Sequence, residues 1–261
     1  MSTSSGEHGR HLLTQFAHAF NSESATFPVN LGKLCAGLGV RLLHKDGIPR
    51  FKAYLAKPGS NWESAVILLP AEGFGTAYER FCIAHEIAHL LLFRELVARP
   101  LTESQHWQLE ELCDDFARKL LVPDLAMQRY LTDREPISML RAAFALSRAA
   151  KVPWVHAALR ISELQSDVFF FRLALSPNQR TKILASTFPR QKERGRLIDE
   201  DTEFARLLRS ITQNHPVGAP VYLNSNILNK SKVPSFSDSL EAAVMLRKTG
   251  ATADAYLAVI Q

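Results

Sequence analysis

The sequence contains the pattern H-E-x-x-H at residues 85–89, which is typical of metal-dependent hydrolases. His85 and His89 are four positions apart, so on a helix they lie about one turn apart on the same face, where one metal ion can bind both. Glu86 lies about 100° further round the helix axis, where it can hold a water molecule beside the metal. A zinc ion with three protein ligands keeps one position open for water and lowers its pKa to roughly 7. The pattern therefore predicts a zinc site that activates water next to a carbonyl group.

The alternative interpretation is an ordinary helix that carries surface histidines. Most residues around the pattern are apolar, namely Phe81, Cys82, Ile83, Ala84, Ile87, Ala88 and Leu90 to Phe93. A helix that is apolar on most sides is buried. Buried histidine and glutamate side chains need partners, and a metal ion supplies one. We therefore favour zinc. Manganese is the alternative metal, because a site of two histidines and a glutamate as third ligand is not selective for one divalent metal.

A helix that could supply the third metal ligand is predicted over residues 101–123. Apolar residues recur there at helical spacing, namely Leu109, Leu112, Cys113, Phe116, Ala117, Leu120 and Leu121. Thr102 or Ser104 can cap its first turn, and Pro123 ends it. On this helix Glu110 and Asp114 are four residues apart and share a face. That spacing suits a site in which Glu110 binds the metal and Asp114 orients a histidine ligand.

Two further residues of this helix leave alternatives open. Glu111 is the main rival of Glu110, and because the two are adjacent the choice depends on the phase of the helix. His106 precedes Glu110 by one turn, so it could donate a hydrogen bond to a developing oxyanion. The alternative for His106 is an ordinary surface histidine.

These two helices together resemble the ImmA/IrrE family of zinc metallo-endopeptidases, which have a gluzincin-like metal site. The resemblance rests on the pattern R-F-x-x-A-H-E-x-x-H at 80–89 and on E-x-L-C-D-x-x-A-x-x-L-L-x-P at 110–123. It also covers residues 28–40, which are similar to the usual opening helix of the family, and extends weakly to about residue 165. The resemblance implies that His85, His89 and Glu110 bind zinc and that Glu86 is the catalytic glutamate.

The resemblance also implies a domain plan and a function. We expect an α+β protein with a zincin-like metallopeptidase domain at 1–125, a helix-turn-helix-like segment at 126–166 and a small α/β C-terminal, sensor-like domain at 167–261. Members with this plan cleave DNA-binding repressors in the cytoplasm and so release stress-response or mobile-element genes. The implied partner is therefore a protein substrate, a helix-turn-helix repressor.

The coarse pattern predicts the elements that position the site. In the first domain we expect helices at 11–20 and 29–38 and strands at 40–43, 51–55 and 65–69, which would form one antiparallel sheet. An extended peptide can pair with a sheet edge, and we favour 65–69 over 51–55 as that edge. In the last domain we expect strands at 168–173, 182–186, 221–223 and 255–260 and helices at 202–211 and 237–247.

Composition predicts an ordinary soluble protein, and the cysteines predict a cytoplasmic one. Hydrophobic residues make up 46% and charged residues 22% of the chain. No apolar run approaches the roughly 20 residues of a membrane span, and the polar start lacks the apolar core of a signal peptide. The odd number of cysteines, Cys35, Cys82 and Cys113, and their spacing predict buried free thiols.

Charge is uneven along the chain and bears on nucleic-acid binding. Residues 1–167 carry equal numbers of basic and acidic side chains, so the whole excess of five positive charges lies in 168–261. The basic stretch at 180–196 could bind phosphate or nucleic acid, although a solvated loop is the simpler interpretation. In the predicted helix pair 137–164, the residues that could meet DNA or an acidic substrate are Arg148, Lys151, His156 and Arg160. A helical spacer packed on the peptidase explains the same pattern.

Two other classes of function remain open. One is a DNA-binding regulator in which zinc is structural, which would need a fourth protein ligand and gains nothing from Glu86. The other is a protein that sequesters a repressor without cutting it.

Overall fold

The computed structural model describes residues 3–23, 27–49, 52–57, 62, 64–73, 76–95, 102–131, 135–176, 179–186, 206, 208, 210, 220–224, 241–249 and 252–260. The fold is α+β, as expected. The chain divides into two compact units, one of residues 1–128 and 146–153, the other of residues 129–145 and 154–261. The helical segment 126–166, which we expected to be a separate part, is divided between these two units.

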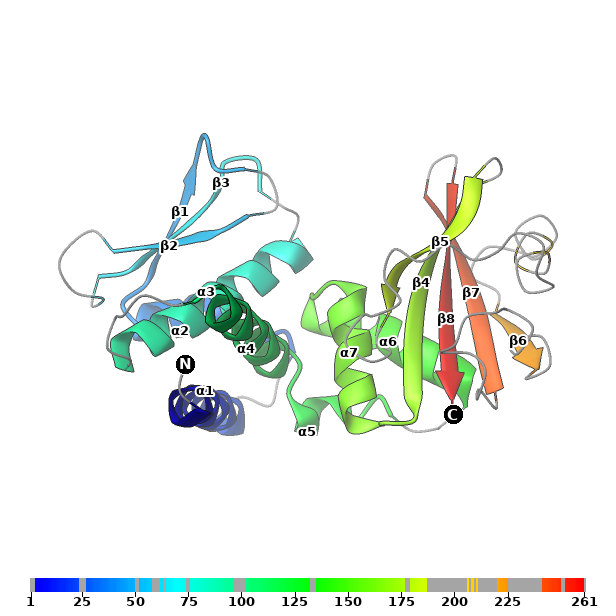
Figure 1. Cartoon of the computed structure of the whole chain (residues 1–261), viewed down its shortest axis with the longest axis horizontal. Coiled ribbons are helices and arrows are strands. Elements are labelled where there is room, and N and C mark those ends of the chain that lie inside the picture. The colour runs from blue at the N-terminus through cyan, green and yellow to red at the C-terminus, as the bar shows by residue number, and fades with distance from the viewer. Residues whose placement is uncertain are drawn as a thin grey trace. The chain divides into compact units, whose positions relative to one another are not determined.

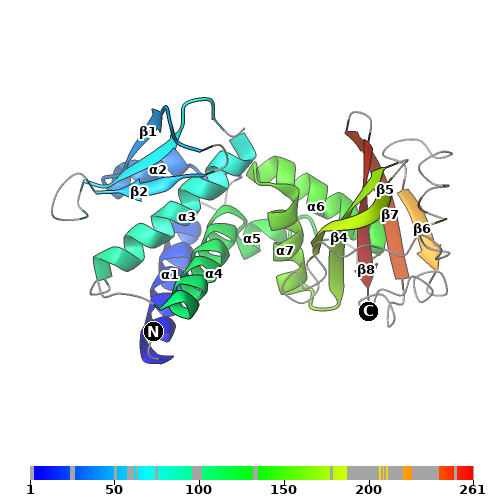
Figure 2. The same cartoon turned by 45° about the horizontal axis from the view of Figure 1, so that its top comes forward.

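In the described residues, the first unit consists of three packed helices, two short helices and a small sheet. Its elements are α1 (Thr3–Glu23), α2 (Leu31–Gly37), β1 (Arg41–Lys45), β2 (Tyr54–Ala56), β3 (Val66–Pro70), α3 (Thr76–Glu95), α4 (Glu103–Leu121) and α5 (Asp124–Met127). α1 and α4 pack on α3, and the sheet also contacts α3 through β2 and β3 (Figures 1 and 2). α3 therefore has neighbours on several sides, which explains its nearly continuous apolar sequence.

Burial and capping explain why α3 and α4 form where the sequence predicts them. Ala84, Ile87 and Leu90 of α3 are completely buried. α4 begins at a capping box, in which the Thr102 side chain accepts from the backbone N–H of Gln105 and the Gln105 side chain accepts from the backbone N–H of Thr102. Each helix therefore has a defined rotation about its axis, which fixes the face that meets its neighbour.

A glycine allows α1 to approach the helices of the site closely. Gly9 is buried, and a Cβ at this position would lie 3.1 Å from Cδ2 of Leu92 and 3.6 Å from Cδ2 of Leu112. Further along α1, Phe16 packs against Phe116 of α4, with 6.2 Å between the ring centroids. α1 thus closes the side of the α3–α4 pair with side chains from both helices.

The small sheet differs from the expected one. Its strand order is β1-β3-β2, with β1 parallel and β2 antiparallel to β3, so the prediction of an antiparallel sheet is wrong. The prediction that 65–69 is the edge is also wrong, because β3 pairs on both sides. The physical reason is burial: four of the five residues of β3 are buried, whereas every residue of β1 is exposed. The most apolar strand lies at the centre of the sheet. Of the two edge strands, β2 makes the more extensive contact with α3.

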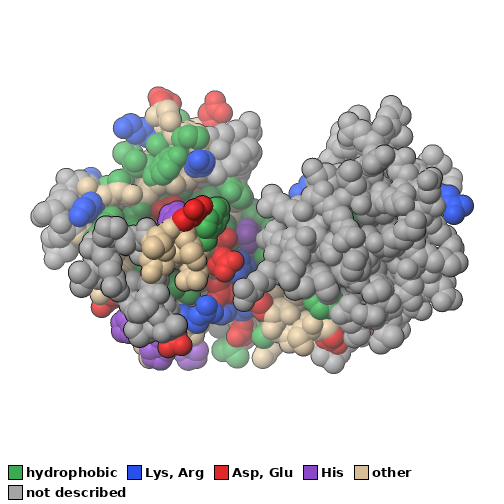
Figure 3. All heavy atoms as spheres, in the orientation of Figure 1, with side chains coloured by type: hydrophobic (Ala, Val, Ile, Leu, Met, Phe, Trp, Pro, Cys, Tyr) green, Lys and Arg blue, Asp and Glu red, His purple; other side chains and the backbone are tan. Residues whose placement is uncertain are grey.

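Apolar side chains remain exposed on this sheet. Leu43 of β1, Leu68 of β3 and Tyr54 of β2 form one row across the strands, with Leu43 and Tyr54 exposed. Figure 3 shows hydrophobic side chains gathered over the sheet in the upper part of this unit.

No helix in the described part of the chain is long and apolar enough to cross a membrane.

Among the described residues, the second unit has a five-stranded antiparallel sheet and two long helices, of which the first ends in residues 146–150 that belong to the first unit. Its elements are α6 (Pro136–Ala150), α7 (Trp154–Leu164), β4 (Val168–Ser176), β5 (Gln179–Ser186), β6 (Pro220–Asn224), β7 (Glu241–Thr249) and β8 (Thr252–Ile260), and the strand order is β5-β4-β8-β7-β6. The predicted helix at 237–247 is wrong, because β7 pairs with β6 and β8. Its alanine, methionine and leucine residues favour a helix locally, but pairing on both sides overrides that preference. Of the predicted helix 202–211, the structure describes only Arg206, Leu208 and Ser210, all helical. Residues 187–196 of the basic stretch lie outside the described residues.

The helix pair α6–α7 packs on this sheet through aromatic rings. Trp154 of α7 lies 5.8 Å from Phe144 of α6, 6.0 Å from Phe170 of β4 and 4.8 Å from Tyr256 of β8, measured between ring centroids. Arg160, a candidate for DNA contact, is only 3% exposed and pairs with Glu163. Its guanidinium group is therefore not on a surface that DNA could reach.

Candidate metal centre

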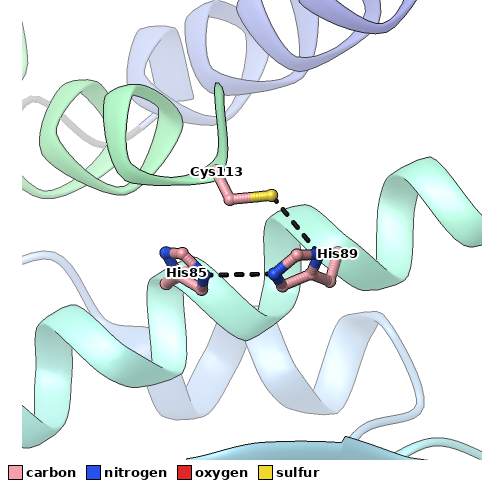
Figure 4. Close-up of side chains that lie close together, drawn as sticks. All are labelled: His85, His89 and Cys113. Carbon is pink, nitrogen blue, oxygen red and sulfur yellow. Dashed lines mark hydrogen bonds between the residues drawn. The ribbon is translucent and has the colours of Figure 1, made fainter. Parts of the chain in front are cut away.

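Three side chains from α3 and α4 converge on one point. The Nε2 atoms of His85 and His89 lie 3.1 Å apart (Figure 4). The Glu110 carboxylate faces both, with one oxygen 3.3 Å from Nε2 of His85 and the other 3.3 Å from Nε2 of His89. Ligands of a tetrahedral zinc ion at 2.0–2.1 Å are about 3.3 Å from one another. The spacing of these three groups therefore fits a metal ion bound between them.

Glu86 lies beside this centre in a largely buried position. Burial raises its pKa to about 7, although the charge of His85 and a hydrogen bond from the backbone of Leu55 act in the opposite direction. Leu55 belongs to β2, so the edge strand of the sheet directly contacts the glutamate. A carboxyl group with a pKa near neutrality can both accept and return a proton.

The outer nitrogen of His85 is held by a carboxylate. Nδ1 of His85 lies 2.8 Å from Oδ1 of Asp114. Burial lowers the pKa of His85, but the hydrogen bonds to Asp114 and Glu110 outweigh burial and raise this pKa to about 9. With Nδ1–H donated to Asp114, Nε2 is the nitrogen left to face the metal position. Asp114 thus has the contact expected of a residue that orients a metal ligand.

The outer nitrogen of His89 faces a thiol instead of a carboxylate. Sγ of Cys113 lies 3.5 Å from Nδ1 of His89 (Figure 4), and Cys113 is completely buried. Burial and the neighbouring charge of His85 lower the pKa of His89 to about 4. His89 is therefore the neutral member of the histidine pair, and its Nε2 lone pair is available to a metal.

The geometry allows two sets of metal-binding atoms. His85, His89 and Cys113 have ligand atoms within 4.8 Å of one another, so this cluster could hold a metal ion. Cys113, however, faces Nδ1 of His89, on the other side of the ring from Nε2. Burial also raises the pKa of the Cys113 thiol, whereas the hydrogen bond with His85 lowers the pKa of Glu110. Because thiolate and carboxylate are the forms that bind metal, Glu110 is the better third ligand.

The remaining candidates on α4 lie further out. Nε2 of His106 is 3.9 Å from the Glu110 carboxylate, and the His106 side chain is 61% exposed, so it lies at the outer side of the centre. Glu111 is exposed, whereas Glu110 is partly buried against the histidines. The phase of α4, which the sequence left open, turns Glu110 towards the metal position.

Two contacts of the centre were not anticipated from the sequence. Cys113 follows Glu110 by three positions and so shares its helix face, a signal that was present in the sequence. The approach of Leu55 to Glu86 had no such signal, because it depends on which strand of the sheet lies at the edge beside α3.

Comparison with known proteins supports the fold only. No protein-family model matches the sequence, and no curated protein sequence is similar to it. Among solved structures, the chain is similar to one described as a "Mycobacterium tuberculosis transcriptional regulator", with a TM-score of 0.52 and 14% sequence identity. The similarity covers 95% of this chain and 76% of the mycobacterial chain. It extends over both units.

Proposed function

We propose that the protein is a zinc-dependent endopeptidase with a zincin-like catalytic domain. The observation that carries this proposal is the convergence of His85, His89 and Glu110 at spacings that suit one tetrahedral metal ion, with Glu86 buried beside them. A structural zinc site would be closed by a fourth protein ligand, whereas a catalytic site keeps a position open. A largely buried carboxyl group next to the metal position is suited to accept a proton from water.

The residues have separate roles in this proposal. When bound, zinc supplies a Lewis acid that polarises the scissile carbonyl and makes a water molecule more acidic. Glu86 accepts a proton from the attacking water and returns it to the leaving amine. Asp114 holds His85 in the tautomer that presents Nε2, and Cys113 is placed to do the same for His89.

The edge strand β2 is the element best placed to align a peptide. It pairs with β3 on one side, and Leu55 of β2 reaches the Glu86 carboxylate. An extended peptide that adds to this edge would gain main-chain hydrogen bonds and pass beside the metal position. Specificity would then come from side chains on either side of the cleaved bond.

The proposed substrate is a DNA-binding repressor of the helix-turn-helix class in the cytoplasm. Support for this comes from the resemblance of residues 80–89 and 110–123 to the ImmA/IrrE family, whose members cleave such repressors to release stress-response or mobile-element genes. The second unit would then have a sensory role, for which the packed sheet and helix pair provide the framework.

The test is a cleavage assay with a repressor encoded beside the gene for this protein. Zinc-loaded wild type and Glu86→Gln are incubated with the repressor, and the products are identified by mass spectrometry. We expect one discrete cut by the wild type, lost after chelation and absent with Glu86→Gln, although that variant keeps its zinc. A cut of equal rate by Glu86→Gln would show that the assigned role of Glu86 is wrong.

A second candidate is a regulator that binds a repressor or DNA without cleaving it. The description of the mycobacterial structure as a transcriptional regulator favours this alternative. It predicts that wild type and Glu86→Gln retain an intact repressor equally well in a pull-down. Retention of intact repressor by zinc-loaded wild type over hours would support it against the endopeptidase.

A further inference from the structure

Aromatic rings extend from the metal centre towards the sheet. The His89 ring stacks on Phe93, one turn later in α3, with 5.7 Å between centroids and 21° between the planes. Phe93 in turn stacks on Trp62, with 5.1 Å between centroids and 26° between the planes. We call these two residues, Phe93 and Trp62, the aromatic wall. Its inner end touches a proposed metal ligand.

The backbone of Trp62 is fixed by the helix that carries the metal ligands. The guanidinium group of Arg94 donates to the Trp62 carbonyl oxygen at 2.7 and 3.2 Å and to the Leu38 carbonyl oxygen at 2.9 Å. Nζ of Lys57 lies 5.3 Å from the centroid of the Trp62 ring. Contacts to both the backbone and the ring therefore hold Trp62 in position beside Phe93.

The aromatic wall is partly exposed. Phe93 is 38% exposed and Trp62 is half-buried, so part of each ring remains accessible to a ligand. The wall is linked to the edge strand β2, because Lys57, the residue that directly follows β2, contacts the Trp62 ring, and Leu55 of β2 contacts Glu86. A partly exposed aromatic surface that contacts a proposed metal ligand at one end and the residue after an edge strand at the other has the properties of a side-chain subsite.

We propose that Phe93 and Trp62 form a subsite that selects substrates with a large apolar side chain next to the scissile peptide bond. This inference rests on the proposed endopeptidase function and names the class of side chain that the site accepts. A small or charged side chain at that position would leave the rings exposed or lose its own hydration, so it would bind more weakly. Phe93 also contacts His89, so Trp62 is the residue whose change tests the subsite without touching a metal ligand.

The experiment compares two metal-chelating inhibitors on the full-length, zinc-loaded protein. Both are succinyl hydroxamates, and they differ only in a benzyl or a methyl side chain beside the chelating group. Isothermal titration calorimetry gives the affinity ratio of the pair for wild type, Trp62→Ala and Trp107→Ala. Trp62→Ala keeps the carbonyl that Arg94 binds, and Trp107, 64% exposed on α4, is the matched tryptophan control.

We expect the benzyl compound to bind wild type and Trp107→Ala at least about tenfold more tightly than the methyl compound, and Trp62→Ala to reduce this ratio to about twofold or less. Trp62→Gln should lower the ratio in the same way as Trp62→Ala. Its side chain is longer than that of alanine, so it replaces the alanine variant if that variant does not fold. A ratio near one in the wild type, or an unchanged ratio in both Trp62 variants, would overturn the inference.

This measurement also separates the inference from the function on which it rests. The affinity ratio does not require peptide cleavage, so an altered ratio supports the subsite even where no repressor is cut. Conversely, if the repressor is cleaved but the affinity ratio is one, the endopeptidase function is supported and the aromatic subsite is refuted.

Discussion

Oδ1 of Asp114 lies 2.8 Å from Nδ1 of His85, so a residue of α4 fixes the orientation of a proposed metal ligand on α3. Asp114→Ala should weaken zinc binding about 10–100-fold, because the imidazole loses the partner that holds its tautomer and rotation. Asp114→Asn keeps an oxygen acceptor and should lose less. Competition with a chromophoric chelator measures these affinities.

The control for this variant is Asp115→Ala. Asp115 is adjacent in α4 but pairs with Lys119 and Arg118 instead of a histidine. Equal zinc affinities of Asp114→Ala and Asp115→Ala would contradict the assigned role of Asp114.

Glu110→Gln and Glu111→Gln form a matched pair that tests the third metal ligand. Glu110 faces the Nε2 atoms of both histidines at 3.3 Å, whereas Glu111 is exposed. We expect Glu110→Gln to lose most of its zinc after dialysis, because the amide is a neutral and weaker ligand, and Glu111→Gln to retain one zinc ion per chain. Metal content is measured by atomic emission. Retention of zinc by Glu110→Gln with loss in Glu111→Gln would reverse the assignment.

Metal binding should release protons at neutral pH. The pKa of His85 is raised to about 9, so the metal-free protein carries a proton on this histidine that the metal must displace. Zinc affinity should therefore increase with pH throughout the range below the pKa of His85 and level off above it. Calorimetry at neutral pH in buffers of different ionisation enthalpy should give at least about one proton released per zinc. An affinity that does not change with pH below the His85 pKa would refute a protonated His85.

Cys113→Ala should affect the centre, although Cys113 is not proposed to bind the metal. The change leaves the buried Nδ1 of His89 without the sulfur that lies 3.5 Å away, so zinc affinity should fall about tenfold. Cys35→Ala is the control, because Cys35 is a buried cysteine of α2. If Cys113→Ala binds no zinc although it still contains Glu110, the Cys113 thiol is itself a metal ligand.

Trp154→Ala should destabilise the second unit by about 3 kcal/mol, because the indole packs against three aromatic rings of α6 and the sheet. Trp107→Ala, at an exposed position, should change stability by no more than about 0.5 kcal/mol. Urea denaturation followed by circular dichroism compares the two variants. Similar midpoints would contradict a structural role of Trp154 and reopen α7 as a recognition helix.

Local sequence signals predicted most helices because their causes are local. The apolar spacing of α3, the cap at Thr102 and the stop at Pro123 act within one or two turns, and the structure follows them. The segment 237–247 misled the prediction, because a helix-favouring composition there is overridden by pairing with two neighbouring strands. Strand order in the small sheet was equally out of reach, since parallel and antiparallel placement depends on which strand the rest of the unit buries.

The sequence alone determined which side chains share a helix face: the spacing of His85 and His89 places two imidazoles on one face, and the spacing of Glu110 and Asp114 does the same for two carboxylates. Only the tertiary structure decided that Glu110 instead of Glu111 faces the histidines. It also decided that Cys113 contacts His89 and that Leu55 of β2 contacts Glu86. Helix periodicity is fixed by backbone geometry and can be read from residue numbers. The rotation of one helix against another and the choice of an edge strand result from packing between segments that are distant in sequence.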